Sequence, residues 1–316
     1  MSRRAAAIAA VVALAAALPW ALSDYRVFQL TLVLTVAIAL LGLNLLTGIN
    51  GQISLGHGAF CAAGAYCAAI LMDRFGLPYW LTIPIAAAIC FGAGFLFGLP
   101  ALRFEGLYLA LATFALAVAT PQLLKHRLFE QWTGGVQGIV LAKPEAPFGL
   151  PISQDRWLYW FSLGVAAIMF LLAWNLVRGR IGRALVAIRD QPLAAESLGI
   201  DTSFYKSTTF GISAMYAGVS GALGAIVLQF VSPDGFSVFL SLGFLVGIVV
   251  GGLGSIPGAI IGALFIHYVP PAASRLSQAA PWAVYGVAVI VFVYLFPTGI
   301  AGLLRPIRGG RNVDRA

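Results

Sequence analysis

Residues 27–72 read VFQLTLVLTVAIALLGLNLLTGINGQISLGHGAFCAAGAYCAAILM, and none of them is charged. A helix needs about 20 apolar residues to cross about 30 Å of hydrocarbon, so this run is long enough for two crossings. Near its middle stand the polar residues Asn50, Gln52, Ser54 and His57, among several glycines. The run therefore predicts two helices at membrane depth, separated by a polar and glycine-rich break.

The rest of the chain repeats this pattern. Of its 316 residues, 60% are hydrophobic and 9% are charged, whereas soluble domains carry roughly 25% charged residues. Charge-free runs cover 5–23, 27–72, 75–102, 106–124, 157–177, 207–233, 235–274 and 276–304. The two longest runs allow two crossings each and the other six allow one, so we expect about ten. Because lipid offers no hydrogen bonds to the backbone, such runs predict an all-α polytopic membrane protein.

The basic residues predict the orientation of these spans. With ten crossings and a cytoplasmic N-terminus, most of the 19 lysines and arginines fall on the cytoplasmic side, as the positive-inside rule requires. We therefore expect both termini in the cytoplasm. The net charge of +8 is scattered along the chain, which favours topology and contact with membrane lipid over nucleic-acid binding. The basic, apolar start of the chain resembles a signal peptide, but we interpret it as the first span.

A single transmembrane permease domain, residues 1–316, is expected, and two polar segments divide it. The segments are an outer Gly/Pro-rich loop at 125–156 and a cytoplasmic loop at 178–206. The remaining parts are a first helix (1–26), a first helical half (27–124), a second helical half (207–304) and a basic cytoplasmic tail (305–316).

The two helical halves contain a similar sequence pattern. TGINGQISLGHGAFCAAGA (Thr47–Ala65) and VGGLGSIPGAIIGA (Val250–Ala263) each place a glycine-rich break before an apolar helix with closely spaced small residues. Paired interruptions of this kind are typical of transporters built from inverted structural repeats with broken helices, which we predict here. The alternative is ordinary small-residue packing between helices. Polar groups in the first break need a water-lined path or, alternatively, only interhelical hydrogen bonds.

The chain shows no energy source of its own. No span carries a central Asp–Arg or Glu–Lys pair, which ion-coupled transporters usually need. The phosphate-loop pattern G-x-x-x-x-G-K-[ST] is absent, because Lys206, the lysine followed by serine, is preceded by Tyr205. A secondary transporter is thus disfavoured, and any ATP hydrolysis belongs to a separate chain.

No catalytic or metal site is predicted either. The cysteines lie in apolar runs without a CxxC pattern, and the three histidines lack ligand spacing. An intramembrane enzyme would need paired acids, but Asp190, Glu196 and Asp201 fit no metal motif. We expect a non-catalytic chain.

The cytoplasmic loop contains GRALVAIRDQPLAAESLGID (Gly182–Asp201). Pro192 suits the first turn of a short helix capped by Asp190 or Gln191, and Gly199 suits the position after its end. Two helical turns are not stable alone, so docking in a groove of another protein is favoured. The alternative is a solvated, positive-inside connection.

This loop resembles the cytoplasmic coupling loop of ABC importer permeases, in the variant found in branched-chain amino-acid permeases. Four further blocks are similar to the same family in the same order: GLNLLTGINGQISLGHGAF (42–60), LRFEGLYLALATFALA (102–117), WTGGVQGI (132–139) and FVSPDGFSVFLSLGFLVGIVVGGLGSIPGAIIGAL (230–264). The resemblance covers about residues 40–301 and is nearer to the LivM type than to the LivH type.

The resemblance implies a multi-pass subunit of the bacterial inner membrane, with the 125–156 loop in the periplasm. Its implied partners are a homologous second permease, two cytoplasmic ABC ATPases and a periplasmic solute-binding protein. ATP and Mg belong to the ATPases, and no cofactor to this chain. The implied solute is a branched-chain or related amino acid, with urea, amides or aromatic acids as alternatives.

Two sets of residues carry these expectations. The ATPase-coupling set, with Glu196 and Arg189 as its expected polar contacts, is Arg183, Arg189, Asp190, Pro192, Leu193, Ala194, Ala195, Glu196, Ser197, Leu198 and Gly199. The expected translocation path contains Asn44, Gln52, Ser54, His57, Tyr108, Thr113 and Ser255, each of which has a packing role as its alternative.

Overall fold

The computed structural model describes residues 13–101, 106–146, 152–276, 281–296 and 298–303, and these are mainly helical. The predicted basic tail at 305–316 and the start of the predicted first helix, residues 1–12, lie outside the described residues. The elements in chain order are α2 (Asp24–Leu43), η1 (Asn44–Ile49), α3 (His57–Phe75), α4 (Tyr79–Ala101), α5 (Leu107–Leu124), α6 (Arg127–Thr133), β1 (Ile139–Val140), α7 (Gln154–Arg178), α8 (Arg180–Asp190), α9 (Pro192–Ser197), α10 (Thr202–Leu228), β2 (Phe230–Val231), η3 (Pro233–Phe236), α11 (Val238–Gly251), α12 (Ile256–Leu276), α13 (Pro281–Leu295) and α14 (Ile300–Leu303).

Helix α10 lies at the centre of the molecule and packs against α2, α3 and α4. Small residues allow this close approach, since a Cβ atom added at Gly221 would collide with the backbone of Cys61 in α3, and one at Gly64 with the backbone of Gly218. Tyr216 of α10 is fully buried, and its hydroxyl donates to the carbonyl of Met169 in α7 at 2.8 Å. The core is therefore a bundle organised around one small-residue helix.

Both predicted breaks are present. The run 27–72 forms α2, continues through the π-helical η1, leaves helical geometry over residues 50–56 and re-enters it as α3. The run 235–274 forms α11, breaks at Gly252–Ser255 and continues as α12. Each long run is thus a helix, a break and a second helix, as its glycines and polar residues indicate.

The number of spans is lower than expected within the described residues. Six helical segments are long and apolar enough to cross a membrane, which agrees with a multi-pass membrane protein: Asp24–Ile49, Tyr79–Pro100, Leu107–Leu124, Gln154–Arg178, Thr202–Leu228 and Ile256–Arg275. Helix α11 has 14 residues and is shorter than a full crossing. The expected ten crossings, the inverted repeat and the orientation stay predictions.

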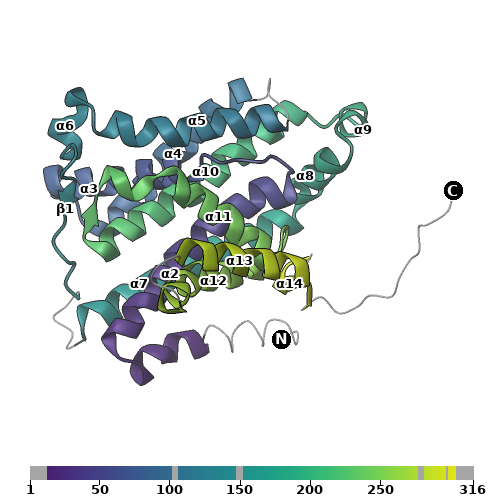
Figure 1. Cartoon of the computed structure of the whole chain (residues 1–316). Helices are drawn as coiled ribbons and strands as arrows, with labels where there is room; N and C mark the ends of the chain where they lie inside the picture. Colours follow the sequence, from purple (N-terminus) through teal and green to yellow (C-terminus); the bar gives the residue numbers. More distant parts are fainter. Residues whose placement is uncertain (1–12, 102–105, 147–151, 277–280, 297, 304–316) are drawn as a thin grey trace.

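The two polar segments lie at opposite ends of the bundle (Figure 1). Helices α8 and α9, from the 178–206 loop, lie at one end, and α6 and β1, from the 125–156 loop, lie at the other. There β1 pairs with β2 in an antiparallel two-stranded sheet, and Lys125 forms an ion pair with Asp234 of η3. The structure places the two loops at opposite ends of the bundle. The assignment of the α8 and α9 end to the cytoplasm stays a prediction.

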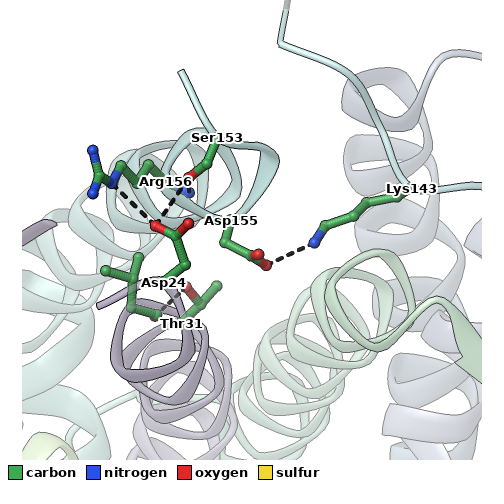
Figure 2. A network of polar contacts seen from close by, with 7 residues as sticks. Asp24, Thr31, Lys143, Ser153, Asp155 and Arg156 are labelled. Carbon is green, nitrogen blue, oxygen red and sulfur yellow. Dashed lines mark hydrogen bonds and ion pairs between the residues drawn. The ribbon is translucent and has the colours of Figure 1, made fainter. Parts of the chain in front are cut away.

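At the same end of the bundle as α6, a polar network connects α2, α7 and the 125–156 loop (Figure 2). Asp24, in the first turn of α2, accepts a hydrogen bond from Ser153 at 3.2 Å and pairs with Arg156 of α7, also at 3.2 Å. Lys143 of the 125–156 loop donates to Asp155 at 2.8 Å. The network holds the first turns of α2 and α7 and the loop together.

Candidate functional site: a docking loop and two broken helices

The 178–206 loop folds into two short helices joined by one residue, Gln191. Helix α8 is amphipathic, because Ala184, Leu185 and Ile188 are buried while Arg180 and Arg183 are exposed. Of the residues of α9, only Ala195 is buried. Leu193, in α9, and Leu198, directly after it, are 83% and 81% exposed. The loop therefore presents two leucines at its tip from a base anchored on the bundle.

Helix α9 closely follows the sequence prediction, ending one residue earlier than expected. Pro192 occupies its first turn, and Gln191 precedes it without a side-chain cap. Gly199 has a φ of +81°, its N–H donates to the Glu196 carbonyl, and the N–H of Ile200 donates to the Ala195 carbonyl. These two bonds are a Schellman motif, which ends a helix where a glycine adopts the left-handed conformation.

The polar residues of the loop bond mainly within the chain. The Glu196 carboxylate accepts a hydrogen bond from the Thr202 hydroxyl at the start of α10. Asp190 does not cap α9, since its carboxylate binds the Arg189 guanidinium at 2.9 Å. Arg189 also donates from Nη1 to the Gly48 carbonyl of η1 at 3.0 Å. The side chains expected to contact an ATPase are thus already engaged, while the leucines are not covered.

The first break, residues 50–56, satisfies its backbone with nearby side chains. The Leu55 N–H donates to the Thr113 hydroxyl of α5 at 2.9 Å, and the Gly56 N–H donates to the Ser54 hydroxyl at 3.3 Å. The carbonyl of Gln52 accepts from the Thr47 hydroxyl at 2.9 Å. Non-helical backbone at membrane depth needs such partners. Ser54 and Thr113 therefore act as supports of the break, and their role in a path stays a prediction.

The two breaks meet through one amide. Asn44, 2% exposed, donates from Nδ2 to the Ser255 carbonyl and accepts at Oδ1 from the Gly254 N–H, both at 2.8 Å. A Cβ atom added at Gly48 would approach the Gly254 nitrogen to less than 3.0 Å. The structure thus brings Asn44 together with the backbone of Ser255, two residues that the sequence places in different halves.

The remaining predicted path residues are dispersed. His57, 1% exposed at the start of α3, donates from Nε2 to the Ala39 carbonyl of α2 at 3.0 Å and meets Phe244 of α11 edge to face. Tyr108 is 70% exposed near the start of α5 and joins none of these contacts among the described residues. The bundle therefore gathers the residues of the two breaks and of α5's Thr113, but not Tyr108.

Sequence reasoning missed two features of the site. Helix α8 was not predicted, although Ile181, Leu185 and Ile188 recur at helical spacing. Asn50 was left out of the expected path, yet its side chain is 3% exposed and has no hydrogen-bond partner in the described part of the chain. A buried amide without partners is costly, so Asn50 marks a place where water, a partner chain or a solute would be favoured. Within the described ranges no three His, Cys, Asp or Glu side chains are placed to hold a metal ion.

Known proteins match nearly the whole chain. The family model described as "Branched-chain amino acid transport system / permease component" matches residues 25–296. The chain is 32% identical to the high-affinity branched-chain amino acid transport system permease protein LivM of Escherichia coli, over 95% of this chain and 75% of that protein. It is 26% identical to BraD of Pseudomonas aeruginosa, over 86% and 93%, and 26% identical to LivH of Escherichia coli, over 86% and 92%. No solved structure matches the chain.

Proposed function

Because the chain belongs to the family of permease components of branched-chain amino acid transport systems, we propose that it is the transmembrane permease subunit of an ATP-driven ABC importer. In this proposal it forms the translocation path together with a second, homologous permease in the bacterial inner membrane. A periplasmic binding protein delivers a branched-chain or related amino acid. ATP and Mg are bound by two cytoplasmic ATPase subunits, and this chain catalyses no reaction.

The observation that carries the proposal is the exposed tip of the 178–206 loop. Leu193 of α9 and Leu198, the residue that follows α9, are more than 80% exposed at the end of the bundle. A helix of this length is not stable alone, but its turn is fixed here by a proline start and a Schellman stop. An apolar helix tip of fixed shape suits a groove on a soluble partner, and helix-in-groove docking on an ATPase is the proposed use.

The proposed solute class follows from the names of similar proteins and not from the residues of the expected translocation path. Relatives that carry the words "branched-chain amino acid" in their names match the chain over most of its length. Urea, short amides and aromatic acids remain alternatives, and binding of each class to the purified cognate binding protein decides among them. Leucine-class binding is the expected result, and selective binding of urea or an aromatic acid would replace it.

The docking proposal is tested by co-purification of the ATPase subunits with the permease. We expect Leu193→Glu together with Leu198→Glu to abolish co-purification and the ATP hydrolysis that loaded binding protein stimulates. The matched control is Leu128→Glu, which places a carboxylate on a leucine 78% exposed in α6 at the opposite end. The control should retain the ATPases. If both variants retain them, α9 is not the docking element.

Uptake by this chain alone distinguishes the proposed importer subunit from a secondary transporter, which would accumulate solute without ATPase subunits. Reconstituted without ATPase subunits, this chain should accumulate no solute in vesicles under a proton or sodium gradient. Accumulation without nucleotide would replace the proposed function.

A further inference from the structure

We propose that Arg189 is a positioning residue that joins the 178–206 loop to both breaks, so that movement of α9 is transmitted to residues 50–56 and 252–255. This inference rests on the proposed function and deepens it. It gives Arg189 a different role from the ATPase contact that the sequence favours. The chain of contacts has two links. Each combines hydrogen bonds with a close approach at a glycine, Gly51 in the first link and Gly48 in the second.

The first link joins α8 to η1. Arg189 is the penultimate residue of α8, three positions before Pro192, where α9 begins. Its Nη1 donates to the Gly48 carbonyl at 3.0 Å, and the adjacent Asp190 carboxylate binds its Nε and Nη2 at 2.9 Å each. The ion pair with this carboxylate fixes the direction of the guanidinium. A cation at the last carbonyls of a helix is also favoured by the helix dipole.

The stem of Arg189 adds a steric contact to this link. A Cβ atom added at Gly51 would lie 2.7 Å from the Cγ atom of Arg189, and Gly51 has a φ of +78°. Both facts favour glycine at position 51, because other residues would be strained there and would displace the stem. Arg189 is therefore in contact with η1 on one side and with the start of the first break on the other.

The second link joins η1 to the second break. Gly48 is close to Gly254, with no room for a side chain between them. The Asn44 amide binds the Gly254 N–H and the Ser255 carbonyl at 2.8 Å. Residues 44–49 form a π-helix, a geometry that is rare and is concentrated at functional sites. A displacement of the Gly48 carbonyl therefore reaches the second break through a buried, hydrogen-bonded contact.

The two links share η1, so they act in series. Arg189 holds the end of η1, and Asn44 holds its beginning against Gly254 and Ser255. Removing either link should release the second break from the docking loop, and removing both should add little. This is the property that distinguishes a series connection from two independent stabilising contacts.

The first experiment needs no transport and measures amide hydrogen exchange in the assembled complex without nucleotide. Arg189→Met keeps an unbranched stem but removes the donors. We expect exchange in residues 252–256 to rise about tenfold, the low end for loss of a charged hydrogen bond because the Arg189 side chain is partly exposed. Within the described residues, Arg189 bonds to Gly48 and Asp190 and not to residues 252–256, so a purely local role would not change the exchange of those five residues. The control is Arg180→Met, another exposed arginine of α8.

Each outcome of this experiment decides the proposal. Raised exchange at 252–256 with Arg189→Met, and not with Arg180→Met, supports it. A change confined to residues 45–52, or an equal change with both variants, overturns it. Asn44→Ala should raise exchange at 252–256 by a similar factor, and the double variant should exceed the single variants by less than about twofold.

The second experiment measures solute uptake per ATP hydrolysed by the full complex in vesicles. Arg189→Met should keep ATPase co-purification and stimulated hydrolysis, while uptake per ATP falls about tenfold; Arg189→Lys should lie between this variant and the wild type. Loss of the ATPases, as with the α9 variants, would instead make Arg189 a docking contact and overturn the proposal. If the wild-type complex shows no ATP-dependent uptake, the proposed function fails, and the exchange result separately decides the link.

Discussion

Replacing Gly221 by alanine should destabilise the bundle through its central crossing. Gly221 lies in α10, where the helix meets the backbone of α3. A Cβ atom at this position would meet the carbonyl oxygen, the carbonyl carbon and the Cα of Cys61, all within 3.0 Å. Backbone atoms cannot rotate away as a flexible side chain would. The two helices must therefore separate by roughly 1 Å, or α10 must bend.

The expected magnitude follows from two opposing terms. Overpacking of a well-packed contact costs about 1–3 kcal/mol, and the upper end applies here because the colliding atoms are backbone. Alanine is favoured over glycine inside a helix by about 1 kcal/mol. The net loss of unfolding free energy is about 2 kcal/mol. Gly224, three residues further along α10, has no heavy atom within 4 Å of an added Cβ, so Gly224→Ala should gain up to about 1 kcal/mol.

The assay is reversible SDS unfolding of the purified chain in mixed micelles, followed by the fluorescence of its seven tryptophans. Gly221→Ala should be the least stable and Gly224→Ala the most stable, with the wild type between them. The unfolding free energies of the two variants should differ by about 3 kcal/mol. Because both variants make the same chemical change on the same helix, their difference isolates the crossing. Equal midpoints for the two variants would refute the packing of α10 on α3 described here.

Three further perturbations test other contacts. Tyr216→Phe removes the 2.8 Å bond to the Met169 carbonyl and should cost about 1 kcal/mol in the same SDS assay, whereas no loss would place the hydroxyl elsewhere. Thr113→Val leaves the Leu55 N–H in the break without its acceptor and should cost about 1–3 kcal/mol, while Thr120→Val, whose hydroxyl donates only to its own helix, should be nearly neutral. A double-mutant cycle on Asp24→Asn and Arg156→Met should give a coupling of about 0.5 kcal/mol that falls in high salt, because this pair is partly exposed; a salt-independent coupling would contradict that reasoning.

Local rules were sufficient where a local cause acts. Pro192 and Gly199 predicted α9 to within one residue, because a proline first turn and a left-handed glycine act on their own backbone. Polar residues and glycines within an uncharged run predicted the break after Ile49 for the same reason. Helix α8, which was not predicted, has an equally local signal, because Ile181, Leu185 and Ile188 recur at helical spacing.

The expected ten crossings stay a prediction, because hydropathy does not distinguish a helix that faces lipid from one that is buried in protein. The run 235–274 is long enough for two crossings, yet its first helix has 14 residues and ends at Gly251. A short apolar helix is stable at membrane depth when neighbouring helices cover it and its break is satisfied by other segments. That requirement concerns packing, which a count of apolar residues does not contain.

The sequence alone determined that this chain is a helical membrane protein, where its long apolar runs break and, to within one residue, where α9 begins and ends. Each of these follows from burial preference or backbone geometry over a few neighbouring residues. Only the tertiary structure decided that Asn44 binds Gly254, 210 residues away, and that Arg189 binds Gly48, 141 residues away. Hydrogen bonds between distant segments depend on how whole helices cross. The sequence around Asn44 or Arg189 therefore does not indicate which distant residue it binds.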